Sequence, residues 1–235
     1  MAPYWTLGPR NALRRQMLFL KGKQESNVTV RYQKMFDCAS ILRENLGESL
    51  KVHSRLLTET LPQMIRAAEL LITAYRHGGK AIFLGNGGSA ADAQHLAAEF
   101  LGRFLQERRP LPALALNTNS SAVTAIGNDY GYDHVFARQL EALAAPNDVV
   151  VAISTSGNSP NVIEALLVAR KRRIPTIGFT GASGGRMRTL VDVLIAVPSS
   201  DTPRIQECHI LVGHSLCCAI EQAIVSEPSF SVASS

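Results

Sequence analysis

The sequence predicts an α/β fold, a three-layer sandwich whose central sheet has five mostly parallel strands. Three observations lead to this prediction. Short apolar runs alternate with stretches of helical periodicity from residue 81 onward. The apolar runs are nearly continuous, as in strands that are buried on both faces of a parallel sheet. The chain has 235 residues, of which 46% are hydrophobic, and this is enough for one domain with a full core.

Two helices are expected before the sheet, over residues 38–77. Apolar residues recur there at helical spacing, and Thr58 or Thr60 followed by Pro62 marks a break and a new helix start. The pattern ends at His77-Gly78-Gly79, a typical helix stop. Because these helices have no sheet of their own, we expect their apolar stripe to pack against another subunit.

Strands and helices then alternate along the rest of the chain. The expected strands are the apolar runs 81–84, 111–116, 148–153, 174–179 and 192–197. The segments between them predict helices that end near Leu105, follow Asn119, span about Asp133–Ala144, end near Lys171 and follow Gly185. A long helix from Thr202 to about Val225 closes the domain. Residues 32–227 are therefore expected to form one domain, followed by a flexible tail over 228–235.

The net charge of +5 comes from the first 31 residues. They contain six of the 24 basic residues and one of the 19 acidic residues, which leaves 18 of each in the rest of the chain. The body is thus neutral, apart from local clusters such as Arg108-Arg109, and we expect no nucleic-acid partner. No apolar run reaches the roughly 20 residues of a membrane span, so no membrane partner is expected either.

The basic leader, residues 1–31, has no clear periodicity. A targeting segment, a disordered tail and a translation start assigned too far upstream all fit its composition, and we expect disorder. The four cysteines form no C-x-x-C pair and no disulfide spacing. We therefore expect reduced thiols and a cytoplasmic protein.

Two polar loops that follow predicted strands, residues 85–89 and 154–159, indicate a ligand site. In a parallel sheet, ligands bind beyond the carboxyl ends of the strands. Glycine lets backbone N–H groups approach an anion, and the following helix adds partial positive charge. We interpret the hydroxyl-rich loop 154–159 as a phosphate site for a small molecule, with a pair of tight turns without ligand as the alternative. Neither loop has the dinucleotide or the Walker sequence.

Two of the predicted helices carry possible metal ligands. His95 and Glu99 are four residues apart and so project from one helical face. Gln206 and His214 are two turns apart, with a rotation of about 80°, and can share a broad face. Imidazole, carboxylate and amide oxygen ligands could complete a tetrahedral zinc site. The alternative is a set of satisfied polar groups in the core or in an interface.

With these residues in place, the chain from about Tyr32 to Glu227 resembles the phosphoheptose isomerases of the sugar isomerase (SIS) domain superfamily. The matching blocks are Gly85-Asn86-Gly87-Gly88-Ser89, His95-Leu96-Ala97-Ala98-Glu99, Gly127-Asn128-Asp129-Tyr130-Gly131, Ser154-Thr155-Ser156-Gly157-Asn158-Ser159 and Arg204-Ile205-Gln206-Glu207-Cys208-His209, together with His214. The resemblance implies a flavodoxin-like SIS fold. It also implies conversion of D-sedoheptulose 7-phosphate to D-glycero-D-manno-heptose 7-phosphate, a step toward ADP-heptose and cell-envelope polysaccharide such as lipopolysaccharide.

The resemblance further implies a homotetramer with one zinc ion per subunit and with active sites between subunits. The implied zinc ligands are His95, Glu99, Gln206 and His214. The implied substrate contacts are Asn86, Gly87, Gly88, Glu99, Asn128, Asp129 and Gln206, with the phosphate held by Ser154, Thr155, Ser156 and Ser159. Glu99 and His214 would move protons, because aldose–ketose isomerisation needs a base at the carbon next to the carbonyl and an acid at the enediolate oxygen. A zinc-bound Glu99 would be a weak base, so its two roles compete.

The sequence departs from the family in two places, the leader and Asn119, where relatives commonly have aspartate. Two other functions remain open. Some SIS-fold relatives are scaffolds that bind the replication initiator DnaA, but these lack the carboxylate at position 99 and the histidine at position 214. A sugar-phosphate sensor would need the phosphate loops without the metal residues. Since Glu99 and His214 are both present, the sequence favours an enzyme.

Overall fold

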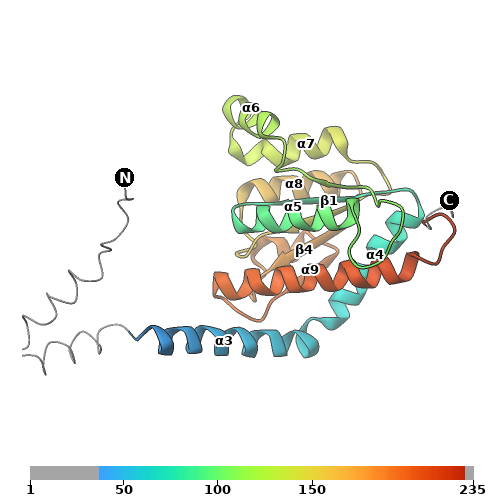
Figure 1. The fold of residues 1–235 in the computed structure, drawn as a ribbon. Coiled ribbons are helices and arrows are strands. Elements are labelled where there is room, and N and C mark those ends of the chain that lie inside the picture. The colour runs from blue at the N-terminus through green and yellow to red at the C-terminus, as the bar shows by residue number, and fades with distance from the viewer. Residues whose placement is uncertain (1–36, 231–235) are drawn as a thin grey trace, which may run out of the picture. The chain divides into compact units, whose positions relative to one another are not determined.

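The computed structural model describes residues 37–230, which form helices and strands in the expected order (Figure 1). The predicted leader lies outside the described residues, as does the end of the predicted tail from residue 231. The chain divides into two compact units, Met1–Gly47 and Glu48–Ser235. Of the first unit, the described part begins helix α3 (Cys38–Glu59), where the Ser40 N–H donates to Asp37 Oδ1 at 3.1 Å.

The central sheet contains five parallel strands in the order β2-β1-β3-β4-β5. Their bounds are β1 Ala81–Gly85, β2 Ala113–Ala115, β3 Val149–Ile153, β4 Thr176–Thr180 and β5 Val193–Ala196. This arrangement confirms the predicted fold class, and every described strand pair is parallel. Strands β2 and β4 each begin two residues later than expected, because Pro112 and Pro175 have no N–H to donate to a neighbouring strand.

Helices cover both faces of the sheet and so make the expected three layers (Figure 1). The helices are α4 Leu61–Arg76, α5 Gly88–Leu101, α6 Ser120–Tyr130, α7 Val135–Leu143, α8 Pro160–Lys171 and α9 Thr202–Ile224, with short 3-10 helices η1 Tyr132–His134 and η2 Gly185–Thr189. Side chains alternate along each strand. Ala81 and Phe83 therefore pack with α4, α5 and α9, whereas Ile82 and Leu84 pack with α7 and α8.

The sheet order places the two polar loops next to each other. Strands β1 and β3 are neighbours, and Gly85 at the end of β1 pairs with Ile153 at the end of β3. The loops that follow these two residues therefore leave the sheet at the same edge and at the same level along the paired strands. This is the position at which open parallel sheets bind ligands.

A buried ion pair fixes the segment between α5 and β2. Glu221 of α9 accepts hydrogen bonds from the backbone N–H groups of Phe104, Leu105 and Gln106 and from Arg108 Nε. The Arg108 and Glu221 side chains are 1% and 2% exposed. Burial by itself would raise the pKa of Glu221, but the three N–H donors and the Arg108 charge lower it below its ordinary value.

Arg108 also ends helix α5. Its guanidinium donates to the carbonyl oxygens of Glu99 at 2.8 Å and Phe100 at 3.0 Å, which have no acceptor role left within the helix. The helix consequently stops at Leu101 rather than near Leu105. Arg108 is thus a buried structural residue and not part of a basic surface patch.

Several large apolar residues of α3 and α4 remain exposed in the single chain. In the second unit these are Leu50, Leu57, Leu61 and Ile65, which are 72%, 72%, 41% and 51% exposed. Within residues 37–230, no helix is long and apolar enough to cross a membrane. Beyond the closing helix, Phe230 packs against the core and its carbonyl accepts from the Arg109 N–H at 3.0 Å.

Candidate active site

Three potential metal ligands from two helices meet at one point. His95 and Glu99 come from α5 and His214 comes from α9, and their ligand atoms all lie within 4.8 Å of one another. His95 Nε2 is 2.8 Å from His214 Nε2 and 3.3 Å from Glu99 Oε1. His95 and His214 are 119 positions apart in the chain, on two different helices, and the fold brings them together.

Close packing of α5 and α9 makes this meeting possible. The two helices lie side by side (Figure 1), and Gly213 faces Leu96 so closely that a Cβ there would be 2.5 Å from Leu96 Cδ2. Each of these two residues directly adjoins one of the histidines. The Phe104 ring stacks on the His214 ring with centroids 5.4 Å apart, and the Phe104 N–H is held by Glu221.

The donor set fits a zinc ion. Two imidazoles and a carboxylate are typical zinc ligands, with bond lengths of about 2.0–2.2 Å, so atoms this close can share one ion. The predicted fourth ligand, Gln206, lies against the same helix α5. Its amide packs against Gly88 at the start of α5, about two helical turns from His95.

A carboxylate that the sequence reasoning did not select lies one turn before His95. Asp92 Oδ2 is buried without a hydrogen-bond partner within the described chain. Burial raises the pKa of Asp92 to about 6, against the opposing effect of His95. The only available signal was the spacing of three residues to His95, which places both side chains on one helical face.

The predicted phosphate loop follows β3 and leads into α8. Ser154 and Ser159 have their hydroxyl oxygens 2.9 Å apart, and Ser156 Oγ accepts from the Asn158 N–H at 3.2 Å. Gly157 has a φ of +66° and contacts the backbone of Gly184, a contact that leaves no space for a side chain. The hydroxyl groups therefore sit at the amino end of α8, where an anion is stabilised.

The loop after β1 supplies the other predicted contacts at this edge. Gly87 has a φ of +55°, and the exposed residues Gly87 and Gly88 lead into α5. Asn86 forms a reciprocal amide pair with Asn161 of α8, with distances of 2.8 and 2.9 Å. The Tyr132 hydroxyl donates to Asn86 Oδ1 at 3.3 Å. Sequence reasoning missed both Asn161 and Tyr132.

Asn128 and Asp129 lie at the exposed end of α6. Asn128 Nδ2 donates to Asp129 Oδ1 at 2.8 Å, and no residue of α6 is fully buried. Within the described residues, no hydrogen bond or ion pair joins either side chain to the three clustered ligands. Asn119 caps the same helix, since its Oδ1 accepts from the Ala122 N–H at 3.0 Å, so the departure from aspartate keeps the cap.

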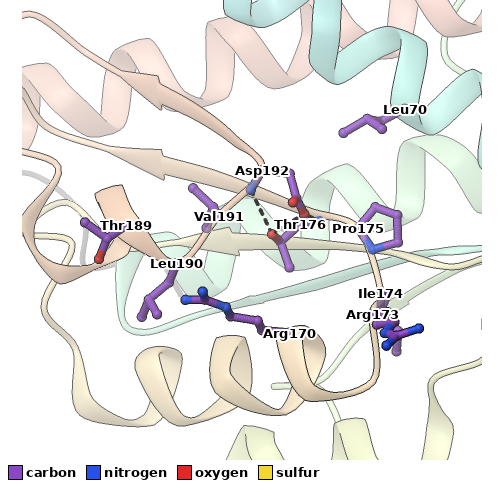
Figure 2. Close-up of a pocket in the computed structure, with 10 residues that line it drawn as sticks. All are labelled: Leu70, Arg170, Arg173, Ile174, Pro175, Thr176, Thr189, Leu190, Val191 and Asp192. Atoms are coloured by element: carbon purple, nitrogen blue, oxygen red, sulfur yellow. Dashed lines mark hydrogen bonds between the residues drawn. The ribbon is translucent and has the colours of Figure 1, made fainter.

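A pocket of about 590 Å³ is lined by residues outside this site (Figure 2). It is lined by residues such as Pro175, Thr176 and Asp192, which precede or begin strands β4 and β5. It therefore opens at the amino ends of β4 and β5, the edge opposite the loops that follow β1 and β3. Asp192 is engaged within the pocket wall, where its N–H donates to Thr176 Oγ1 at 3.0 Å and its Oδ2 accepts from the Thr176 N–H and hydroxyl.

Known proteins resemble this chain over most of its length. Residues 46–181 match the SIS domain family. The phosphoheptose isomerase of Rhodospirillum rubrum is 55% identical over 170 residues, which cover 72% of this chain and 90% of that protein. That of Pelobacter propionicus is 57% identical over 163 residues, covering 69% and 86%.

Solved structures give the same result. The phosphoheptose isomerase from Neisseria gonorrhoeae is 44% identical, with a TM-score of 0.75 over 79% of this chain and 100% of that chain. The Vibrio vulnificus NanR protein, at 16% identity and a TM-score of 0.53, shares the fold alone. On the strength of the full-length relatives and the matched domain, the chain belongs to the phosphoheptose isomerase family of SIS-domain proteins.

Proposed function

We propose that this chain isomerises D-sedoheptulose 7-phosphate to D-glycero-D-manno-heptose 7-phosphate, a step toward ADP-heptose and cell-envelope polysaccharide. The observation that carries this proposal is the convergence of His95, Glu99 and His214 from two helices at one point. The hydroxyl-rich loop 154–159 at the amino end of α8 supports it as a site for the phosphate. The name shared by the relatives at 50–57% identity supports it. The scaffold alternative is disfavoured because both Glu99 and His214 are present and adjacent.

Each group at the site has a chemical task in this proposal. Ser154, Thr155, Ser156 and Ser159 bind the phosphate at the amino end of α8, and this fixes the distance from phosphate to reacting carbons. Glu99 takes the proton from the carbon next to the carbonyl, and His214 exchanges a proton with the substrate oxygens. The remaining predicted contacts, which are Asn86, Gly87, Gly88, Asn128, Asp129 and Gln206, orient the sugar chain.

Zinc is proposed as the bound metal, one ion per subunit, held by His95, Glu99 and His214 with Gln206 as the fourth ligand. When bound, such an ion polarises a carbonyl and stabilises negative charge on its oxygen. The amide of Gln206 lies next to Gly88, on the helix that carries His95 and Glu99. Glu99 is 21% exposed, which leaves one side of the carboxylate accessible to substrate.

We also propose a homotetramer in the cytoplasm. The exposed apolar residues Leu50, Leu57, Leu61 and Ile65 support an interface between subunits, because a monomer gains nothing from exposing them. Among the cysteines, Cys208 and Cys217 are buried, and all four described cysteines are free, which fits a reducing compartment.

The decisive experiment incubates the purified protein with sedoheptulose 7-phosphate, with and without a chelator, and measures the aldose product. We expect turnover that the chelator removes and zinc restores. Glu99→Gln and His214→Gln should each lower kcat by about 10²–10⁴-fold, the range for loss of a general acid or base. Glu141→Gln, at an exposed position of α7, is the matched control and should keep full activity. Retained turnover in either site variant would remove the proposed mechanism.

A further inference from the structure

The buried amide of Asn161 holds the partly exposed amide of Asn86. Asn86 Nδ2 donates to Asn161 Oδ1 at 2.8 Å, and Asn161 Nδ2 donates to Asn86 Oδ1 at 2.9 Å. Asn161 is 2% exposed, so its side chain has a fixed position in the core. Two hydrogen bonds in opposite directions fix both the position and the plane of the Asn86 amide.

This amide pair links the two loops of the candidate active site. Asn86 directly follows β1, and Asn161 is the second residue of α8, directly after the phosphate loop 154–159. The two residues are 75 positions apart in the chain, and their strands β1 and β3 are neighbours. A displacement of one loop is thus transmitted to the other through the pair.

The hydrogen-bond inventory of Asn86 leaves one group for a ligand. A primary amide has two N–H donors and two lone pairs on its oxygen. Asn161 uses one N–H and one lone pair, and the Tyr132 hydroxyl donates to the same oxygen at 3.3 Å. Among the bonds within residues 37–230, the second N–H of Asn86 is left to donate to a substrate oxygen.

We propose that Asn161 is a positioning residue for the isomerisation, acting through Asn86. It keeps the second N–H of Asn86 directed at the sugar and keeps the Asn86 loop in register with the phosphate loop. This inference rests on the proposed role of Asn86 as a substrate contact. Because a misplacement of about 1 Å can cost a factor of about 100 in rate, we expect the loss of Asn161 to lower kcat/KM by about 10- to 100-fold.

A double-mutant cycle on kcat/KM tests this proposal. The variants are Asn86→Ala, Asn161→Ala and the double variant. If Asn161 acts through Asn86, the double variant has the kcat/KM of Asn86→Ala within about two-fold. The inhibition constant of inorganic phosphate is measured in parallel, and it should stay within about two-fold of the unmodified chain, since the phosphate loop itself is intact.

Two further variants separate positioning from stability. Asn161→Asp keeps the side-chain volume but cannot donate to Asn86 Oδ1, so it should lose part of the activity. If Asn161→Ala does not fold, Asn161→Asp replaces it in the cycle. Gln139→Ala is the matched control, because Gln139 is also a buried amide but donates only to the Val135 carbonyl in its own helix. It should lower Tm without changing kcat/KM.

The possible failures are distinguishable. If Asn86→Ala keeps full kcat/KM, both the substrate role of Asn86 and the role of Asn161 are refuted. If Asn86→Ala is impaired while Asn161→Ala and Asn161→Asp keep full kcat/KM, only the role of Asn161 is refuted. The role of Asn161 is also refuted if the losses of kcat/KM in the two single variants multiply in the double variant. A rise in the phosphate inhibition constant large enough to account for the whole loss of kcat/KM would refute it as well.

Discussion

A methyl group at position 213 should separate the two helices that carry the clustered histidines. A Cβ on Gly213 would lie 2.5, 2.7 and 3.1 Å from Leu96 Cδ2, Cδ1 and Cγ. Carbon atoms pack at about 3.5–4.0 Å, so Gly213→Ala lacks roughly 1 Å of space. Either α5 and α9 move apart by that amount or Leu96 leaves its rotamer.

The expected effect on stability is small, because two contributions oppose each other. Overpacking a core costs about 1–3 kcal/mol. Replacing a helical glycine by alanine returns about 1 kcal/mol through helix propensity. The net loss of unfolding free energy for Gly213→Ala should therefore lie between about 0 and 2 kcal/mol, and the protein should fold.

The expected effect on metal binding is larger. Gly213 adjoins His214 and Leu96 adjoins His95, so the displacement directly changes the distance between the two imidazoles. Changes to groups that orient metal ligands commonly lower affinity by about 10–100-fold, and we expect a loss in this range for Gly213→Ala. Competition with a chromophoric chelator measures the zinc affinity, and calorimetry of the metal-free protein measures stability.

Two variants control for effects other than the clash. Gly47→Ala adds the same methyl group to helix α3, where nothing lies within 4 Å of the new atom, and should leave zinc affinity unchanged. Leu96→Ala removes all three atoms that the methyl group meets. In that background Gly213→Ala should cost little further zinc affinity. Wild-type zinc affinity in Gly213→Ala, or an equal loss with and without Leu96, would refute the reasoning.

Three other predictions concern charge and surface. Asp92→Asn should raise the stability of the metal-free protein by about 1–2 kcal/mol at pH 8, after allowance for solvent screening, because the pKa of Asp92 is raised to about 6 in the folded state. The folded state therefore binds the Asp92 proton more tightly than the unfolded state does. Below pH 4 the carboxyl is protonated in both states, so the gain in stability should disappear there. Thermal unfolding at pH 8 and below pH 4 checks this. Glu221→Gln should lower the free energy of unfolding by about 3 kcal/mol, since it leaves the Arg108 charge buried and unpaired. Because the pKa of Glu221 is lowered in the folded state, this contribution is present at neutral pH and is lost as the pH falls through the folded-state pKa. Denaturant titrations at a series of pH values will measure it. Leu57→Glu should dissociate the proposed tetramer in sedimentation experiments while the exposed Glu48→Lys does not, and an unchanged assembly in Leu57→Glu would place the interface elsewhere.

The fold was predictable because its signals are local. Apolar runs of four to six residues and helical periodicity each involve neighbours in sequence, and the five strands lie within one or two residues of their predicted bounds. The spacing of His95 and Glu99 is likewise local, so their common face could be expected. That these residues meet His214 depends on how α5 and α9 pack, and Gly213 provides this closeness without any signal of its own in the pattern.

The supporting residues of the site were not predictable, because their partners are distant in sequence and their residue types suggest other roles. Arg108 sits in a basic pair, a pattern that gives no indication of a buried partner, yet it pairs in the core with Glu221, 113 positions away. Asn161 sits in a loop-to-helix junction where an asparagine is ordinary, and only the neighbouring strands β1 and β3 reveal its amide partner. Each of the two residues fixes an element that contains a predicted site residue. Arg108 fixes the end of α5 just beyond Glu99, and Asn161 fixes the loop of Asn86. Local patterns thus identify the groups that react, whereas the precision with which those groups are held depends on long-range contacts that only the folded chain contains.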